Sequence, residues 1–466
     1  MLSSTSRASG DRAIFFAFLS LLIWLPLPLG SNRAWAWSVM EVWVLLLSLA
    51  WLVQYLRGRV VTSQAFVQAW PVTLGLAVVC AWVALQAVPL QAGLLQLLSP
   101  GAYEIHAATN SDLTITLNAY GTRVSVLQSV SYLLIFCLVL LLLNDKRRVR
   151  LLAQVLVISG VLQAAYGSLM TLSGVEYGFF FEKEAYRGVA TGTFVNRNHL
   201  AGYLELCLAL GIGLMVAQLS ATVAATWRDR ARRFLETMLS SKALIRLGLV
   251  IMVIGLVLTQ SRMGNIAFFS SMLITGVCYV LVVRRLTRGI VFFFISLLVI
   301  DLFVVGNYFG IEEVANRIQR AAVEGDMRTD LVRDTLFIVK DFPLTGTGAG
   351  SFFSVFPMYN TGALEFGFFK HAHNDYLEFA TDLGLVALAL LAFCVLLSLW
   401  QGFRAQFERR DRLLQGMGFA SIMAIVALLM HSFTDFNLHI PANAATFMVV
   451  MALAWVSRFG SRGSGA

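Results

Sequence analysis

Long apolar runs fill most of this chain and limit what it can fold into. Twelve of them come close to the length of about 20 residues that a helix needs to cross a bilayer. They cover 13–30, 34–56, 66–88, 124–143, 151–173, 199–219, 245–261, 263–283, 289–309, 376–400, 413–433 and 441–458. Only 13% of the 466 residues are charged, against about 25% in soluble domains. The sequence therefore predicts an all-α polytopic membrane protein with about twelve transmembrane helices, and it excludes a soluble enzyme.

The distribution of basic residues predicts the orientation of these spans. With the N-terminus in the cytoplasm, 23 of the 35 Lys and Arg residues fall in cytoplasmic segments or at the adjoining span ends. Since positive residues concentrate on the cytoplasmic side, this orientation is favoured. The net charge of +9 then reflects cytoplasmic loops, and no nucleic-acid partner is expected.

The spans and the long outer loops divide the chain into three regions. Two of the long loops, 89–123 and 174–198, interrupt the first nine spans, and a third precedes the tenth. The predicted regions are 1–309 for the first nine spans, 310–375 for a large outer loop, and 376–466 for the last three spans and a cytoplasmic tail.

The loop 310–375 has the pattern of folded structure. Apolar residues at helical spacing predict one helix over 311–324, and a second helical run covers 327–341 and stops before Pro343. A glycine-rich stretch, 346–350, follows. It lacks the preceding strand and the Lys-Ser/Thr pair of a nucleotide loop. We interpret it first as a turn, with a backbone site for phosphate as the alternative.

Several even-numbered spans begin on the outer side with polar sequences. Helix N-termini carry free N–H groups and a partial positive charge, so they favour anions. The polar starts are Asn196-Arg197-Asn198-His199, Gln260-Ser261-Arg262, His371-Ala372-His373-Asn374-Asp375 and Asp435-Phe436-Asn437-Leu438-His439. The last precedes Pro441, which suits the first position of a helix. These starts predict an anion site at the outer boundary of the membrane.

Arg262 lies in an otherwise apolar stretch, between the seventh and eighth spans. A charge at bilayer depth costs roughly 2.5–3.5 kcal/mol and less near the interface, so a partner must offset it. A bound anion would do so. The alternatives are a side chain that reaches to the interface, or an ion pair with Asp301. Arg262 within one broken helix is a further alternative to two separate spans.

Arg187 and Arg197 lie ten residues apart in the loop before the sixth span. The planar fork of arginine donates two parallel hydrogen bonds and suits phosphate. Small residues between them would let a ligand approach the backbone: Gly188, Gly192 and Thr193. The alternatives are contact with a lipid headgroup or a salt bridge to Glu182 or Glu184.

His373 is predicted to begin the helix of the tenth span. The helix dipole and nearby arginines disfavour imidazolium there, so a neutral ring could accept a proton. Helix capping by Asn374 or Asp375 is the structural alternative. A metal site at His371 and His373 has little support, because no carboxylate pattern accompanies them. We therefore expect neither a metal nor a cofactor.

From about Arg187 onward the chain resembles the O-antigen ligase and O-antigen polymerase superfamily. The residues that carry this resemblance are G-T-F-x-N-x-N-x-L-A at 192–201, Q-S-R at 260–262, D-x-P-L-x-G-x-G-x-G-S-F at 341–352, A-H-N-D-Y-L-E at 372–378 and H-S-x-x-D-F-N-L-H-I-P-A-N-A at 431–444. The family usually has proline where this chain has Arg197. The functional histidine of the family is matched here by His373, and the architecture is similar to that of the type-C glycosyltransferases.

The resemblance implies a multi-pass glycosyltransferase of the bacterial inner membrane, with its active site facing the periplasm. It would transfer a glycan from undecaprenyl pyrophosphate to an acceptor hydroxyl, without metal and with inversion. Arg187 and Arg262, with Arg197 as a weaker candidate, would hold the pyrophosphate, and His373 would orient or deprotonate the hydroxyl. The supporting residues would be Asn196, Asn198, His199, Gln260, His371, Asn374, Asp375 and Asp435.

Several acceptors fit this chemistry. A polysaccharide polymerase adds to another lipid-linked glycan, an O-antigen ligase to lipid A–core, and a protein O-oligosaccharyltransferase to a protein hydroxyl. The folded outer loop and the 431–444 ending favour the polymerase. The alternative from another class is a transporter or flippase of the lipid-linked glycan, which would place more charges at mid-depth. Membrane lipids, and a chain-length regulator or export proteins, are the further partners considered.

Overall fold

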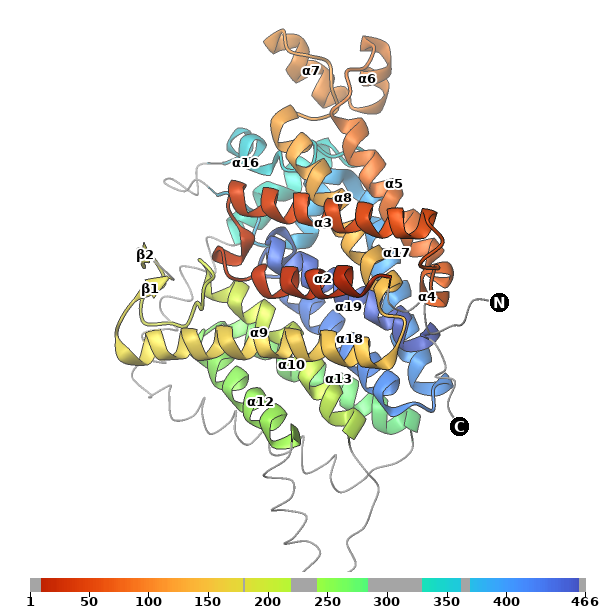
Figure 1. Ribbon diagram of the computed structural model, residues 1–466. Helices are drawn as coiled ribbons and strands as arrows, with labels where there is room; N and C mark the ends of the chain where they lie inside the picture. Colours follow the sequence, from red (N-terminus) through yellow and green to blue (C-terminus); the bar gives the residue numbers. More distant parts are fainter. Residues whose placement is uncertain (1–9, 179–180, 219–240, 284–328, 362–368, 461–466) are drawn as a thin grey trace, which may run out of the picture.

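The computed structural model describes residues 10–178, 181–218, 241–283, 329–361 and 369–460. These residues form a bundle of helices (Figure 1). Strand structure among them is limited to one antiparallel hairpin of β1 (Tyr177–Gly178) and β2 (Phe181–Glu182). The protein is an all-α polytopic membrane protein, as the apolar runs predict.

Eight of the described helices are long and apolar enough to cross a membrane. They are α3 (Ala34–Leu56), α8 (Ala119–Leu142), α9 (Lys146–Ser173), α10 (Arg197–Gln218), α13 (Arg262–Val283), α17 (Asp375–Glu408), α18 (Arg412–His431) and α19 (Pro441–Phe459). Three shorter apolar helices are α2 (Arg12–Trp24), α5 (Trp70–Gln86) and α12 (Ser241–Leu258). Together they match eleven of the twelve predicted spans. The remaining one, 289–309, and its Asp301 lie outside the described residues.

Three span boundaries differ from the prediction or resolve an alternative. Helix α2 ends at Trp24 rather than at residue 30, and a turn and the short η1 (Leu29–Ser31) follow, because Pro26 and Pro28 cannot continue a helix. Gln260 has a left-handed φ of 53°, so α12 and α13 are separate helices rather than one broken helix. Helix α17 is longer than predicted and bends at Gly384, where φ is 80°.

The centre of the bundle consists of α10, α18 and α19, which are buried along most of their length. Glycines allow α10 and α18 to approach closely, since a Cβ on Gly213 would overlap the backbone of Gly416. Small residues at helix contacts are typical of membrane bundles, because van der Waals packing rather than the hydrophobic effect holds the helices together.

The loops predicted on the outer side pack against each other around a second, smaller apolar core. Short helices α6 (Ala92–Leu98) and α7 (Pro100–Thr109) contribute Leu95 and Ala102. Residues 329–341 are helical and end before Pro343, as predicted, and α16 (Phe352–Val355) and η2 (Phe356–Met358) complete the cluster. The predicted helix over 311–324 lies outside the described residues.

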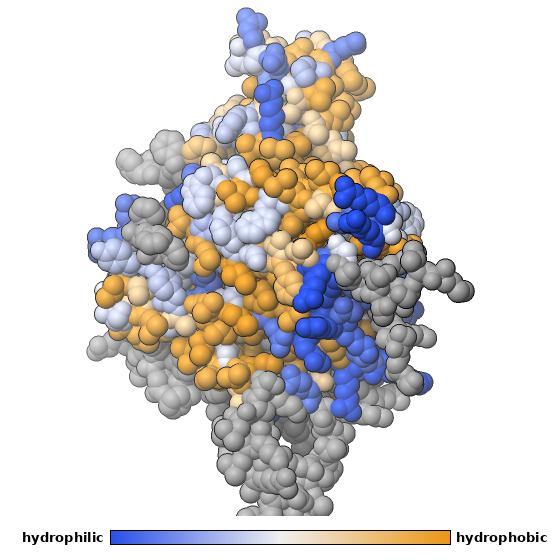
Figure 2. Space-filling view, in the orientation of Figure 1, coloured by the Kyte–Doolittle hydropathy of each residue, from blue (hydrophilic) through white to orange (hydrophobic). Residues whose placement is uncertain are grey.

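Basic side chains gather at the other end of the bundle, where α9 and α18 begin. Lys146 pairs with Asp411 at 2.6 Å, and the buried Arg148 pairs with Asp11 at 2.6 Å. In Figure 2 the face over α2, α3 and α9 is largely hydrophobic, and hydrophilic residues gather toward the side of the two termini. This is the arrangement expected of helices whose basic ends share one membrane surface. The remaining short helices are α4 (Gln64–Gln68) and η3 (Asn437–His439).

Candidate functional site

Four polar helix starts meet at one end of the bundle, as the sequence predicts. The starts of α10 and α19 approach through His199 Nε2 and Asp435 Oδ1, 3.6 Å apart. The start of α17 reaches η3 through Asp375 Oδ1 and His439 Nδ1, 2.8 Å apart. A Cβ added to Gly264, in the first turn of α13, would lie 2.7 Å from Ala201 Cβ in the first turns of α10, so Arg262 belongs to the same end. Proline 441 is the first residue of α19, as expected.

Asp375 is fully buried and organises the junction between α17 and η3. Its carboxylate accepts hydrogen bonds from Ser432 Oγ at 2.7 Å, from the Leu438 N–H at 3.2 Å and from His439 Nδ1 at 2.8 Å. A buried carboxylate needs such partners, because an unpaired charge in a low-dielectric environment is costly. Asp375 is therefore a structural centre of the site.

Glu378 joins two histidines on the same wall. Its Oε1 lies 2.7 Å from His371 Nδ1 and 3.4 Å from His439 Nε2, and its Oε2 accepts the Ala372 N–H at 2.8 Å. Burial alone would lower the pKa of His439, but the carboxylates of Glu378 and Asp375 outweigh it and raise that pKa to about 9. His439 therefore carries a proton at neutral pH.

Three histidine rings surround Phe436. His371 stacks on it with a centroid distance of 4.1 Å, and His199 and His373 meet it edge-on at 4.6 Å and 4.9 Å. Burial would raise the pKa of the adjacent Asp435 carboxyl, but contact with His199 and the charges of nearby histidines hold it well below its usual range. Phe436 thus contacts all three histidine rings.

The start of α17 corrects one prediction. The helix begins at Asp375, not at His373, and Asn374 is its N-cap, accepting the Leu377 N–H at 3.1 Å. The capping alternative is therefore confirmed. His373 precedes the helix with a left-handed φ of 50°, a backbone conformation that is uncommon for residues other than glycine.

The arginines of the loop before α10 lie near the surface. Arg187 Nη2 pairs with Glu182 Oε1 at 2.6 Å, and the two side chains are 59% and 65% exposed. The salt-bridge alternative is therefore what the structure shows for Arg187. Its Nε donates to the Lys183 carbonyl at 2.8 Å, while the Arg197 guanidinium lies over the Tyr186 ring at 5.9 Å.

Backbone contacts fix this loop beside Arg262. The Ala190 N–H donates to the Leu258 carbonyl at the end of α12, over 2.8 Å, and Arg262 follows four residues later as an exposed side chain. Within the loop, Lys183 Nζ pairs with Glu176 Oε2 at 2.8 Å. Burial alone would raise the pKa of Glu176. The lysine and the hydrogen bond from the Gly188 N–H outweigh burial and lower that pKa.

Two of the small residues in this loop pack inward rather than toward a ligand. A Cβ on Gly192 would lie 2.6 Å from Gln163 Oε1, and Thr193 bonds both Gln163 and the Pro26 carbonyl. Gly188 alone of the three has open space around it, with nothing within 4 Å of an added Cβ. The prediction that all three admit a ligand is therefore wrong for Gly192 and Thr193.

The glycine-rich stretch 346–350 is a turn, and its N–H groups are already used. All five donate to acceptors of the protein: the carbonyls of Phe342, Thr381 and Asp382, Gln86 Oε1, and Asp382 Oδ2. At Gly348, where φ is 103°, a Cβ would overlap Thr116. The alternative of a backbone site for phosphate is therefore wrong. The turn instead packs against α17 near its bend at Gly384.

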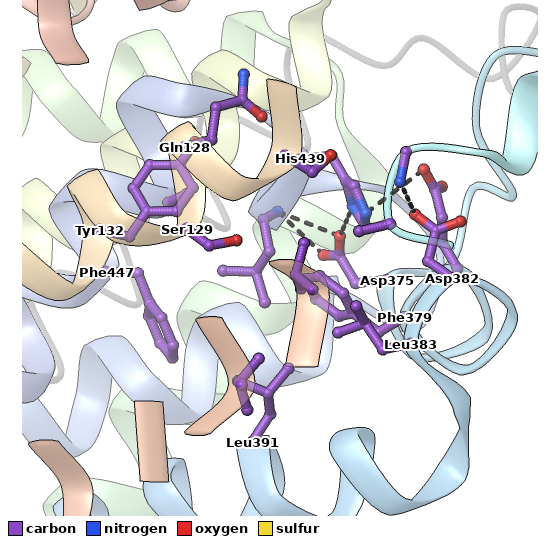
Figure 3. A pocket seen from close by; sticks show the side chains of 18 of the residues that line it. Gln128, Ser129, Tyr132, Asp375, Phe379, Asp382, Leu383, Leu391, His439 and Phe447 are labelled. Carbon is purple, nitrogen blue, oxygen red and sulfur yellow. Dashed lines mark hydrogen bonds and ion pairs between the residues drawn. The ribbon is translucent and has the colours of Figure 1, made fainter. Parts of the chain in front are cut away.

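A cavity of about 850 Å³ lies beside this wall (Figure 3). Helices α3, α5, α8, α17, α18 and α19 line it with mostly apolar side chains. Asp375, Glu378 and Asp382 line one side together with His371 and His439. The lining does not include His373 or the three arginines at 187, 197 and 262.

Sequence reasoning missed much of this wall. The segments 372–378 and 431–444, which carry the family resemblance, contain Glu378, Phe436 and His439. The sequence therefore pointed to these segments but did not assign a role to the three residues. Gln86 and the α8 residues facing the cavity gave no signal, because nothing in their local pattern distinguishes them from other span residues. The buried pair of His431 and Glu205, 2.7 Å apart, was also missed.

Residues 247–392 match the family model described as O-antigen ligase. This domain supports the O-antigen ligase and polymerase superfamily. The matched residues include Arg262, the glycine-rich turn and the start of α17. The match supports glycan transfer of the ligase and polymerase type, with lipid-linked glycan and acceptor as general substrates. None of the curated proteins matches the chain.

Proposed function

We propose that this protein transfers a glycan from undecaprenyl pyrophosphate to an acceptor hydroxyl, and that it is a polysaccharide polymerase. The observation that carries the proposal is the meeting of polar helix starts at one end of an apolar bundle. Arg197 and Arg262 stand at two of these starts and His373 stands just before a third, and the O-antigen ligase match covers Arg262 and His373. Helix N-termini add a favourable potential for an anion.

In this proposal the arginines hold the pyrophosphate of the donor. The leaving group gains negative charge as the glycosidic bond breaks, so preorganised cations stabilise the transition state more than the ground state. Arg262 stands at the start of α13, Arg187 stands in the loop before α10, and Arg197 is the first residue of α10. The exposed pair of Arg187 with Glu182 is weak, so a diphosphate can replace the carboxylate.

His373 meets the Phe436 ring edge-on at 4.9 Å and lies near the Asp435 carboxylate. We place it against the reacting glycan, which it orients for attack. Attack from the face opposite the pyrophosphate inverts the anomeric carbon. Asn196, Asn198 and Gln260 flank the arginines and support the loop and helix starts on which they stand.

We propose that this end faces the periplasm of a bacterial inner membrane. The opposite end carries the basic residues at the starts of α9 and α18, and positive residues favour the cytoplasmic side. A donor flipped across the membrane would then reach the arginines from the outer leaflet.

The test uses purified protein in lipid nanodiscs with a lipid-linked glycan. Arg262→Ala and His373→Ala should each lower transfer by roughly 10²–10³-fold, as expected when a donor to developing charge is removed. The matched control is Arg404→Ala at the opposite end, where the arginine pairs with Glu408. Full activity in both site variants would contradict the assignment.

The product identifies the acceptor. A polymerase lengthens the lipid-linked glycan into a ladder with no lipid A present. Transfer that requires lipid A–core would indicate a ligase, and transfer to a protein would indicate an O-oligosaccharyltransferase. Flipping of the donor across a liposome without any transfer would indicate a transporter instead.

A further inference from the structure

We propose that helix α6 lies in the membrane leaflet at the end of the bundle where the polar helix starts meet, and that it inserts Leu94, Leu97 and Leu98 among the lipid chains. The hairpin of α6 and α7 thereby anchors the loop 89–123 to the membrane surface without crossing it. The partner of this surface is the lipid bilayer. The inference does not depend on the proposed glycan transfer.

The chain carries no charge from the membrane span α5 through α6. Between Arg59 and Glu104 the sequence has no Asp, Glu, Lys or Arg, although α5 ends at Gln86. Loops in water are normally rich in charged residues, because these are the residues that most rarely avoid solvent. The stretch that follows α5 therefore has the composition of a span without the length of one.

Helix α6 presents three leucines that no described residue of the protein covers. Leu94, Leu97 and Leu98 are spaced as i, i+3 and i+4, so they lie on one side of the helix, and they are 44%, 79% and 39% exposed. Leu95 is fully buried and joins the smaller apolar core of the outer loops. One side of α6 thus packs on the protein, and an apolar side faces out of it, as in helices that lie in a membrane interface.

The bend of α17 marks the depth at which lipid contact begins. Directly after Gly384, Leu385 and Val386 are 46% and 64% exposed, and exposed apolar side chains continue along the helix. The end of α5 is fixed to this bend, because Gln86 and Trp82 donate to carbonyls of the turn before Gly384 at 2.9 Å and 3.0 Å. Helix α5 therefore ends where the lipid-facing surface of α17 starts.

The link from α5 to α6 keeps α6 close to this depth. Only residues 87–91 join the two helices, a distance of at most about 20 Å when fully extended. The Leu90 N–H donates to the Leu113 carbonyl at 2.7 Å and ties the link to the returning chain. Leu85 and Val88 are exposed along the way. The exposed apolar surface of the span therefore continues onto α6.

Charged and polar residues of the hairpin gather on α7 and the turn after it. Glu104, Thr109, Asn110 and Asp112 are all exposed there. Figure 2 shows the hairpin as largely hydrophobic over α6 and hydrophilic over α7. A lipid-facing side next to a water-facing side is the arrangement of a segment that lies on a membrane.

The residue types on this surface favour lipid over a second protein chain. The exposed side chains of 87–98 are leucine, valine, proline, alanine and glutamine. The centres of protein interfaces are instead enriched in aromatic residues, methionine and arginine, and leucine and valine are under-represented among the residues that dominate binding. Aliphatic side chains with neutral glutamines suit acyl chains and the polar boundary above them.

Insertion of α6 also holds the smaller apolar core at the membrane surface. Leu95 packs in that core with Phe342 and Phe352, which precede and follow the glycine-rich turn 346–350. At the other end of the hairpin, a Cβ on Gly101 would lie 3.0 Å from the Phe342 ring. The lipid contact of α6 is thus connected by packing to the turn that contacts α17.

The test measures the depth of single sites in the full chain. The five native cysteines are replaced by alanine, and a nitroxide is attached to one introduced cysteine at a time. The labelled protein is placed in vesicles of phosphatidylethanolamine and phosphatidylglycerol. Electron paramagnetic resonance then compares collisions with oxygen, which concentrates among lipid chains, with collisions with a water-soluble nickel chelate. Val386→Cys is the lipid-facing reference and Asn110→Cys the water-facing one.

The ratio of oxygen to nickel collisions decides the proposal. We expect Leu94→Cys, Leu97→Cys and Leu98→Cys to give ratios above unity, as Val386→Cys does, and Asn110→Cys to give a ratio below unity. Ratios at the three leucine positions that equal the ratio at Asn110 would place α6 in water and overturn the proposal. Low collision rates with both probes would mean that protein covers α6, and would overturn it as well.

A second pair of variants tests whether the leucines carry the insertion. Leu97→Asp combined with Leu98→Asp should bring the label of Leu94→Cys to the ratio of the water-facing reference, because a charge among lipid chains is costly. The matched control combines Ala107→Asp with Ala108→Asp, two exposed positions on α7, and should leave that ratio unchanged. Equal shifts in the two combinations would contradict the assignment of the membrane contact to α6.

Discussion

The two sides of the site are built in opposite ways. On the arginine side, Arg187 and its partner Glu182 are more than half exposed, and the pair can exchange. On the cavity side, Asp375 and Glu378 are nearly buried, and hydrogen bonds hold Glu378 to His371 and Asp375 to His439. The cavity side is therefore organised before any substrate arrives. On the arginine side, Arg187 can exchange Glu182 for a bound anion.

The physical cause is the cost of burying charge. A carboxylate in a low-dielectric interior must be paired. If one partner is removed, the remaining charge is buried without a counterion, and its desolvation cost is no longer offset. An exposed ion pair gains little from its attraction and loses little when it opens. Substitutions on the cavity side should therefore lower the free energy of unfolding. Substitutions on either side should lower the rate of glycan transfer.

The largest effect on stability should come from the buried pair behind the site. Glu205→Ala leaves His431 buried without its partner at 2.7 Å, and should cost about 3–5 kcal/mol. The matched control is Glu182→Ala, which removes an exposed acid and should leave the unfolding temperature almost unchanged. Equal shifts in the two variants, measured by thermal unfolding in detergent, would erase the contrast.

The second effect depends on pH. The folded-state pKa of His439 is about 9, above the unfolded value of about 6.5, so the protonated ring stabilises the fold fully below pH 6.5. That contribution, up to about 3 kcal/mol, is lost as the pH rises through 9. Stability measured from pH 6 to 10 should fall accordingly in the wild type, and His439→Gln should lack this part of the slope. An identical slope in the variant would refute the role of His439.

A smaller effect separates two glycines with left-handed φ. Gly188→Ala meets open space and should cost about 1 kcal/mol of backbone strain, whereas Gly348→Ala also overlaps Thr116. We expect Gly348→Ala to be the more destabilising by at least about 1 kcal/mol. The comparison is wrong if the two unfolding curves coincide.

The smallest effect on stability should be at the arginine side. Arg187→Gln breaks an exposed pair and should change the free energy of unfolding by less than about 1 kcal/mol. Its effect should appear instead as a raised KM for the donor, stronger at low salt, because screening already weakens the interaction at high salt. A large loss of stability with an unchanged donor KM would reverse the roles of the two sides.

Sequence patterns predicted the span order and the polar helix starts well, because apolar length and capping residues are local properties. They also singled out the segments that hold Arg262, His371 and Asp435. They did not predict the cavity, since which face of α8 meets α17 depends on packing between segments more than 200 residues apart. Nor could they distinguish His371 from His373, because only the folded chain shows that His371 lines the cavity and that His373 does not.

The bend of α17 at Gly384 ties the carboxylates to distant parts of the chain. Because the helix departs from regular geometry there, the carbonyls of 381–383 accept from Thr347, Gly348, Gln86 and Trp82 instead of being confined to the helix. The start of α17 is thereby held both by the glycine-rich turn 346–350 and by α5. A displacement of the glycine-rich turn would therefore disturb the part of α17 that carries Asp375, Glu378 and Asp382.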